Sequence, residues 1–389
     1  MKKILIIGSG ISGLACAFYL KKNGYEPTIY ESSSTYGGKI KSPKINGYIC
    51  DEGFQVLLNN YSEIKKMDCY DGINIRYFNS GANIYYKNKK LRFYNPLFHP
   101  IKFICSDFSS IFRIKDIFNI AKLSLSSRIS NSTTNNYLNK NISIKASKLF
   151  FKPFFRGIYL NDKLEYNFIF FKKLINKFIF GRAGIPMFGM QELPKNIIKK
   201  GSLNNIVYNT TLKKIENNKA IFIDRTIKFD KIVLALPIHV IDQILNLNIN
   251  FSYNKNSTFY FSSRLKILNK SILLIADKNF AINSIQCLTN ISSAYSPEGK
   301  YLYSVSSNNN LLKINDAKYE FEKITGLNSS QYKLIKSYHL SKALPKEIFK
   351  IKNENENIFY CGDWSEEASI DGAVKSGRKT AELMIKTLK

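Results

Sequence analysis

The chain combines a length beyond one ordinary domain with a strong excess of positive charge. It has 389 residues, with 58 Lys and Arg against 29 Asp and Glu, and a formal net charge of +29. This length predicts two domains. No stretch reaches ~18 uninterrupted apolar residues, so no transmembrane helix is predicted. The six Cys residues form no C-x-x-C pair and the three His residues are scattered, so we predict free thiols in a reducing cytoplasm and no metal site.

The N-terminus reads as a strand, a glycine-rich turn and a helix. Ile4 to Ile7 is a short apolar run of the kind that forms a buried parallel strand. Glycines follow in G-x-G-x-x-G spacing, and apolar residues then recur at helical spacing. This context is typical of dinucleotide binding, in which a pyrophosphate meets free N–H groups at the helix N-terminus. The predicted contacts are Gly8, Ser9, Gly10, Ile11, Ser12 and Gly13.

Glu31 strengthens this interpretation, because it ends the next apolar run, 18 residues after Gly13. A carboxylate there accepts hydrogen bonds from ribose hydroxyls and repels the 2′-phosphate of NADP. We predict a contact from Ser32 as well. The same N-terminus also resembles a signal peptide, but its apolar stretch is broken by glycines that fall in motif register, so the nucleotide loop is favoured.

A glycine pair with a basic residue, Gly37-Gly38-Lys39, follows this strand and suits a second approach to the pyrophosphate. Here the chain resembles the flavin-containing amine oxidase superfamily, which includes phytoene-type desaturases and protoporphyrinogen oxidases. In that superfamily a G-G-R-x-x-[ST] segment marks FAD rather than NAD. Lys39 replaces the usual arginine, which keeps the charge but loses bidentate geometry, and Ser42 stands at the hydroxyl position.

Three further segments extend the resemblance. Residues 51–57 stand where the family's backbone passes close to the flavin ring, which implies contacts from Gly53, Phe54 and Gln55. Residues 184–190 resemble the P-x-G-G-M segment where the chain returns to the FAD domain. Residues 209–215 and 231–237 resemble the family's adenine-side strand and its A-T-P-like strand end, which implies that the Leu212 backbone meets the adenine.

The C-terminus carries the last part of the resemblance. A short apolar run ends in Gly362-Asp363, and Asp363 corresponds to the family's ribityl- or phosphate-side acidic residue. An amphipathic helix is predicted after it, capped by Ser369 or Asp371. In the family this helix points its N-terminus at the N1–C2=O edge of the flavin, where its dipole stabilises negative charge. The implied contacts are Gly362, Asp363, Ile370, Asp371, Gly372 and Ala373.

These features together predict an α/β protein: a Rossmann-like FAD-binding domain with a parallel sheet, plus a mixed α+β substrate (cap) domain. The FAD domain is expected to be discontinuous, at 1–60, 185–245 and 352–389, with 61–184 and 246–351 forming the cap. No cysteine attachment motif of the family is present, so the FAD is expected to be non-covalent.

Aromatic and basic residues alternate in the cap, at 97–118 and at 150–173. Two interpretations stay open. In the favoured one the aromatics form the cap core and the lysines extend outward. In the other, this cytoplasmic protein contacts the anionic inner face of a membrane peripherally. Both predict an apolar substrate channel. No nucleic-acid module is present, and the sequence does not indicate an oligomeric state.

The resemblance implies an FAD-dependent oxidoreductase that dehydrogenates a hydrophobic small molecule, isoprenoid, polyene or tetrapyrrole-like, by hydride transfer to flavin. An amine is the alternative substrate. Alternatives of another class are a non-redox isomerase that uses reduced flavin and an FAD-binding structural subunit. No His, Glu or Lys of the cap carries a recognisable motif, so no catalytic residue is predicted.

Overall fold

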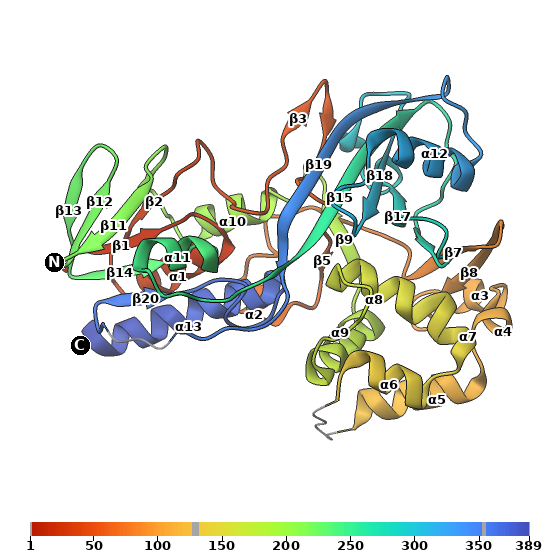
Figure 1. Ribbon diagram of the computed structural model, residues 1–389, viewed down its shortest axis with the longest axis horizontal. Helices are drawn as coiled ribbons and strands as arrows, with labels where there is room; N and C mark the ends of the chain where they lie inside the picture. Colours follow the sequence, from red (N-terminus) through yellow and green to blue (C-terminus); the bar gives the residue numbers. More distant parts are fainter. Residues whose placement is uncertain (1, 127–131, 352–354, 389) are drawn as a thin grey trace.

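The computed structural model describes residues 2–126, 132–351 and 355–388. A parallel sheet with its helices lies at one end of the molecule, and a large mixed sheet and a group of helices lie at the other (Figure 1). Strands β15 and β19 reach from one part toward the other (Figure 1). The α/β fold class, with a parallel sheet and a second mixed part, is therefore confirmed.

The parallel sheet has five strands drawn from distant parts of the sequence. Its order is β10 (Ile206–Val207), β2 (Thr28–Tyr30), β1 (Ile4–Ile7), β14 (Lys231–Leu234) and β20 (Ile358–Tyr360), and every neighbouring pair is parallel. Because successive side chains point to opposite faces, Ile4 and Ile6 enter one core cluster while Leu5 and Ile7 enter another. Both faces are therefore covered, as a parallel sheet requires.

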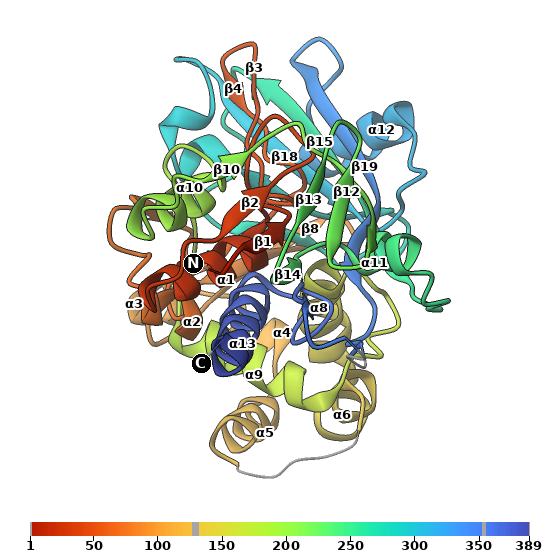
Figure 2. The same ribbon diagram turned by 90° about the vertical axis from the view of Figure 1, so that its left-hand side faces the viewer.

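Helices and a small antiparallel sheet provide this cover. The elements are α1 (Ile11–Lys22), α10 (Glu192–Lys200), α11 (Ile238–Leu245), α13 (Ile370–Leu388), β11 (Leu212–Glu216), β12 (Lys219–Phe222) and β13 (Thr226–Lys228). Helices α1 and α13 lie against each other, which Figure 2 shows beside the sheet. A Cβ on Gly377 of α13 would lie 2.2 Å from the carbonyl oxygen of Ser12. Only glycine allows this approach.

The mixed sheet has seven strands. Its order is β19 (Tyr332–Pro345), β15 (Tyr253–Ser263), β18 (Tyr301–Ser307), β17 (Ile282–Cys287), β16 (Ile272–Ile275), β7 (Gly81–Tyr86) and β8 (Lys89–Tyr94). Neighbours are antiparallel except β16 and β7. Helix α12 (Ile314–Thr325) contributes Phe321 to a core cluster with Phe259 and Phe261, so it covers one face.

The helical lobe holds most of the aromatic residues that the sequence singled out. It contains α3 (Pro100–Ile104), α4 (Phe108–Ile111), α5 (Ile114–Leu125), α6 (Thr134–Asn141), α7 (Ile144–Ala146), the π-helical turn η1 (Ser147–Phe151), α8 (Lys152–Tyr159) and α9 (Phe168–Phe180). In the 150–173 segment Phe151, Phe155 and Phe171 are buried, and Phe150 and Phe154 pack against them. That segment forms the core of the lobe, as favoured.

Short elements join these parts. They are β3 (Lys44–Ile45), β4 (Tyr48–Ile49), β5 (Leu57–Leu58), α2 (Ser62–Lys66), β6 (Ile75–Tyr77), β9 (Ala183–Pro186) and the 3-10 turns η2 (Leu288–Asn290) and η3 (Ser293–Tyr295). We propose the domain division expected from the sequence, because the strands of the parallel sheet come from the three expected segments. Residues 1, 352–354 and 389 of those segments, including the expected boundary at 352, lie outside the described residues.

Candidate functional site

The N-terminal glycine loop turns directly from β1 into α1. Gly8 has a φ of +104°, and its N–H donates to the Tyr30 carbonyl oxygen at 2.8 Å. Gly10 precedes the first turn of α1 in extended conformation, no side chain caps this helix, and no acidic residue lies in its first turn. The N–H groups and the positive end of the helix dipole are therefore offered to an external anion.

The two glycine segments lie against each other beside this helix end. Gly37 N–H donates to the Ser9 carbonyl oxygen at 3.0 Å, which brings the second segment onto the first. A Cβ on Gly10 would meet only the Cα of Gly38, at 3.8 Å, whereas a Cβ on Gly13 would lie 2.1 Å from the Gly8 carbonyl oxygen. Gly13 thus permits close packing, and Gly10 leaves open space of the kind a pyrophosphate fills. The residues present fit a dinucleotide.

Glu31 is held as an anion at the end of β2. One carboxylate oxygen accepts from the N–H and hydroxyl of Ser9, both at 2.8 Å, and the other accepts from the N–H and hydroxyl of Ser33 at 2.9 and 2.8 Å. Burial raises its pKa, but these hydrogen bonds outweigh burial and leave the pKa below its ordinary value. The Ser32 hydroxyl lies 3.4 Å from Glu31 Oε1. Binding a ribose would require the serine hydroxyls to share this carboxylate.

Lys39 and Asp363, predicted separately, form an ion pair. The distance from Lys39 Nζ to Asp363 Oδ2 is 2.7 Å, although 324 positions separate the two residues. Gln55 Nε2 donates to the Lys39 carbonyl oxygen at 3.0 Å. The structure therefore brings the second glycine segment, the predicted flavin segment and the end of β20 together.

Of the two predicted caps for the N-terminus of α13, Ser369 and Asp371, the structure shows Ser369. Ser369 Oγ accepts from the N–H of Gly372 at 3.0 Å. The Asp371 carboxylate instead accepts from the N–H of Glu63 at 2.9 Å, at the start of α2, and pairs with Lys177 of α9 at 2.8 Å. Any contact of Asp371 with a cofactor would therefore come from its backbone.

The remaining predicted residues lie in this region. Gly362 adjoins Trp364, while Ile370 and Ala373 pack in the core cluster with Phe54. Leu212 pairs with Phe222 in the small antiparallel sheet, and its side chain is buried beside Tyr30. The segment before it reaches the expected strand end, because Thr210 N–H donates to the Glu31 carbonyl oxygen at 2.8 Å.

Sequence reasoning missed the role of Asp51. Its buried carboxylate accepts from the Ser42 hydroxyl, from Met190 N–H at 3.1 Å and from Tyr295 OH at 2.9 Å, and its carbonyl oxygen accepts from Tyr260 OH at 2.8 Å. Burial raises its pKa to about 6, despite these hydrogen bonds. A carboxylate directly after the apolar run Tyr48-Ile49-Cys50 was the available signal.

This Asp51 network joins four distant segments. Ser42 follows the second glycine segment, Met190 ends the segment that returns from the helical lobe, and Tyr260 and Tyr295 belong to the mixed-sheet part. The segment from Asp51 to Gln55 is thereby fixed between the two parts of the protein. Asp51 acts as a positioning residue for the backbone predicted to pass the flavin.

Comparison with known proteins finds one family and several individual relatives. The family model for flavin containing amine oxidoreductase matches residues 11–258. A 1-hydroxycarotenoid 3,4-desaturase of Flavobacterium sp. (strain P99-3) is 49% identical over 53 residues, 14% of this chain and 11% of that protein. Protoporphyrinogen oxidase 2 of Arabidopsis thaliana is 38% identical over 63 residues, 16% of this chain and 12% of that protein. The chain thus matches about an eighth of the length of these relatives.

A solved structure extends the likeness to the whole fold. An oxidoreductase from Methanosarcina mazei superposes with a TM-score of 0.77 at 18% identity, covering 98% of this chain and 100% of that one. At this identity the likeness shows the fold alone.

The glycine geometry makes a paired prediction. Gly10→Ala should fold but lose most of its FAD, because the added methyl enters open space where a pyrophosphate would approach the backbone. Gly13→Ala should fail to fold, because its Cβ would overlap a backbone oxygen. Flavin content and circular dichroism of the two purified variants check this. A folded Gly10→Ala with stoichiometric FAD would contradict the phosphate-loop assignment.

Asp51 makes stability depend on pH. Because its pKa is raised to about 6 from an ordinary value of 3.8, the folded state binds more protons than the unfolded state between these values. The free energy of unfolding should therefore fall as pH rises from 4 to 6, by about 1–3 kcal/mol from this group. Asp51→Asn should remove that fall, whereas the exposed control Asp316→Asn should keep it, in urea unfolding of the apoprotein at several pH values. An unchanged pH profile in Asp51→Asn would refute the raised pKa.

Proposed function

Because the chain belongs to the flavin-containing amine oxidoreductase family, whose cofactor is FAD, we propose that it is an FAD-dependent oxidoreductase. Bound FAD supplies a hydride acceptor, and the protein supplies position and electrostatics. The observation that carries this proposal is the uncapped end of α1, where a Cβ on Gly10 would meet nothing closer than the Gly38 Cα at 3.8 Å.

The chain's own residues would hold the cofactor along the edge of the parallel sheet. The first N–H groups of α1 would meet the pyrophosphate, and Glu31 would meet the ribose. Lys39 would add a positive charge beside the phosphates while Asp363 keeps it in place. The N-terminus of α13, capped by Ser369, would point its dipole toward the ring. We propose as FAD contacts all the residues that the sequence predicted to contact the cofactor.

For the substrate we propose a hydrophobic small molecule of isoprenoid, polyene or tetrapyrrole-like type, which the protein dehydrogenates. The names of two relatives support this, since one is a carotenoid desaturase and one a protoporphyrinogen oxidase. Each relative matches this chain over a short segment only, so the choice among these substrate classes depends on the structure of the cap.

One face of the mixed sheet is polar where the sequence predicted an apolar channel. It is the face opposite α12, and it contacts the predicted flavin segment through the bond from Tyr260 OH to the Asp51 carbonyl oxygen. Ser304 lies opposite both Tyr260 and Gln286 in the register, so the three side chains share this face. The next row holds Thr258, Ser284 and Ser306. The sheet face that contacts the flavin segment through Tyr260 therefore carries hydroxyls and an amide beside that contact.

Gln286 is the most informative residue of this face. It is completely buried, and within the described residues neither atom of its side-chain amide has a hydrogen-bond partner. Burying an unpaired amide costs free energy, so such a group calls for a partner absent from the chain itself. We infer that the substrate carries polar groups on an apolar body. Within the proposed classes this favours a tetrapyrrole-like molecule over a hydrocarbon polyene.

We also propose that the helical lobe makes peripheral contact with the anionic inner face of the cytoplasmic membrane. Helix α5 is apolar on both sides: Ile120 and Leu123 are buried, while Ile114, Phe118 and Leu125 are 84%, 67% and 85% exposed. A helix that exposes an apolar stripe suits a membrane interface.

Other features of the lobe support this contact. Lys115 and Lys122, seven positions apart and exposed, share one side of α5 and could reach lipid phosphates. Ile101 and Ile104 of α3 are exposed as well. Most of these exposed apolar residues belong to the first aromatic–basic cluster, at 97–118, whereas the phenylalanines of the second cluster form the core. Among the described helices none is long and apolar enough to cross a bilayer.

Anaerobic reduction of the bound flavin tests the proposed reaction. We expect a reduced tetrapyrrole to bleach the flavin absorbance, and Gln286→Leu to slow this at least tenfold, because one polar contact to the substrate is lost. Without substrate, Gln286→Leu should unfold at higher urea, by about 1 kcal/mol, because a buried unpaired amide is removed. Gln243→Leu, at an exposed glutamine, is the matched control.

The other outcomes separate the rival functions. Bleaching by amines alone would establish an amine oxidase. Turnover without net bleaching, and only after added reductant, would establish an isomerase. A flavin that no candidate substrate reduces, in a protein with no turnover, would indicate a structural subunit.

Vesicle sedimentation tests the membrane contact. Basic residues near an anionic surface contribute about 1 kcal/mol each and are screened by salt, whereas inserted apolar side chains are not. Replacing Ile114, Phe118 and Leu125 by Ser should therefore remove the salt-resistant part of binding. Replacing the exposed Ile223, Leu311 and Leu383 should leave it unchanged. If the wild-type protein does not bind anionic vesicles at low salt, the contact does not exist.

A further inference from the structure

A cavity away from the predicted cofactor loop lies between the small sheet β5–β9–β6 and the turns η2 and η3. Its volume is about 350 Å³. Three cationic residues line it, Arg76 on β6, Arg182 just before β9 and Lys270 before β16, together with Ser292 and Ser293. No carboxylate lines it. We call it the Arg182 cavity.

The charges in this cavity are uncompensated. Over residues 2–126, 132–351 and 355–388, none of Arg76, Arg182 and Lys270 forms an ion pair. By contrast Lys39, Lys177 and Arg378 are all paired with carboxylates. Like charges that converge on one pocket repel one another, so an anion bound there would gain from all three and relieve this repulsion.

Arg182 is fixed in place for such a role. Its guanidinium carbon lies 4.5 Å from the centre of the Tyr77 ring, and its backbone N–H donates to Asn59 Oδ1 at 2.8 Å. Its Nε is buried and has no hydrogen-bond partner among the described residues. Since Nε is buried, the two terminal nitrogens of this oriented guanidinium are the donors that would bind an oxyanion in bidentate fashion.

The positive field extends beyond the cavity. The pKa of His99 is lowered, first by burial and then by the charges of Lys102 and Arg182. His99 precedes α3, whose Ile101 and Ile104 are exposed. Arg182 thus acts close to α3, whose exposed apolar residues support the proposed lipid contact of the lobe.

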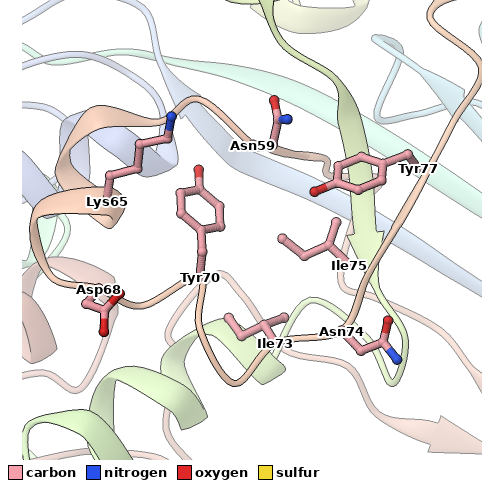
Figure 3. Close-up of a pocket in the computed structure, with 8 residues that line it drawn as sticks. All are labelled: Asn59, Lys65, Asp68, Tyr70, Ile73, Asn74, Ile75 and Tyr77. Carbon is pink, nitrogen blue, oxygen red and sulfur yellow. The ribbon is translucent and has the colours of Figure 1, made fainter.

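A larger cavity of about 620 Å³ adjoins this one and shares Ile75 and Tyr77 with it. Figure 3 shows its lining, in which the aromatic rings of Tyr70 and Tyr77 lie around Ile73 and Ile75. This larger cavity is partly apolar, so it has room for the body of a ligand whose anionic group is held at Arg182.

We propose that the Arg182 cavity binds a multiply charged oxyanion of the phosphate type. Arg182 supplies the bidentate contact, Arg76 and Lys270 neutralise the charge, and the Ser293 hydroxyl supplies a neutral donor. The phosphate belongs either to a free molecule or to the headgroup of an anionic lipid. The site is distinct from the cofactor loop and does not rest on the proposed oxidoreductase activity.

Calorimetric titration of the FAD-loaded protein with inorganic tripolyphosphate at low salt tests this site, because bound FAD keeps the probe out of the phosphate loop. We expect saturable binding, weakened about tenfold or more in Arg182→Gln, the ratio expected for loss of a charge-assisted contact. Arg264→Gln, at an exposed arginine outside the cavity, removes the same charge and should bind like wild type. Flavin content and circular dichroism verify folding.

Two further measurements complete the test. If Arg182→Gln does not fold, Lys270→Gln at an exposed position should still weaken binding, while Lys313→Gln should not. Vesicles of phosphatidylcholine with and without phosphatidic acid separate the sources: selective, Arg182-dependent binding to phosphatidic acid identifies a headgroup site, and its absence alongside tripolyphosphate binding identifies a free ligand. No saturable binding of either probe, or equal binding by the cavity and control variants, would overturn the proposal.

Discussion

The close approach of α1 to both of its neighbours is the constraint on which the rest of the structure depends. Gly13 lets the helix lie against the turn at Gly8, and Gly377 lets α13 lie against the backbone at Ser12. A single methyl at either glycine would overlap a carbonyl oxygen. The N–H groups of α1 are useful to an anion only because these contacts fix where the helix begins, above the carboxyl ends of the strands.

Three buried carboxylates hold the functional segments around this helix. Glu31 joins the two loops at Ser9 and Ser33, Asp51 joins the glycine segment to the mixed-sheet part, and Asp371 joins α13 to α2 and α9. Each accepts at least one backbone N–H. Because a buried charge is costly unless such donors surround it, each carboxylate specifies one arrangement of segments that are far apart in the sequence.

The positively charged side chains occur in two kinds of environment in this fold. In the first half of α13 the cations are paired, since Arg378 contacts Glu63 and Glu382, while Lys375 and Lys379 contact Glu366. The pairs with Glu63 and Glu366 fasten the helix to the body of the protein. At the Arg182 cavity and along α5 the cations have no such role, and there the charge is available to anions outside the chain.

The sequence by itself determined the parts whose physics is local. The glycine spacing, the strand before it and Glu31 predicted the turn, because φ values above zero and close backbone approach restrict a position to glycine. The helical spacing of apolar residues, with polar residues on the opposite face, likewise predicted α13. Only the tertiary structure decided what the cap presents to the site. Gln286 and Ser304 look unremarkable in sequence, and become a polar face only when β17 and β18 pair in one register. The partners of Asp51, and the convergence of Arg76, Arg182 and Lys270, likewise join positions dozens to hundreds of residues apart. Their arrangement depends on sheet register and loop closure, which local composition does not encode.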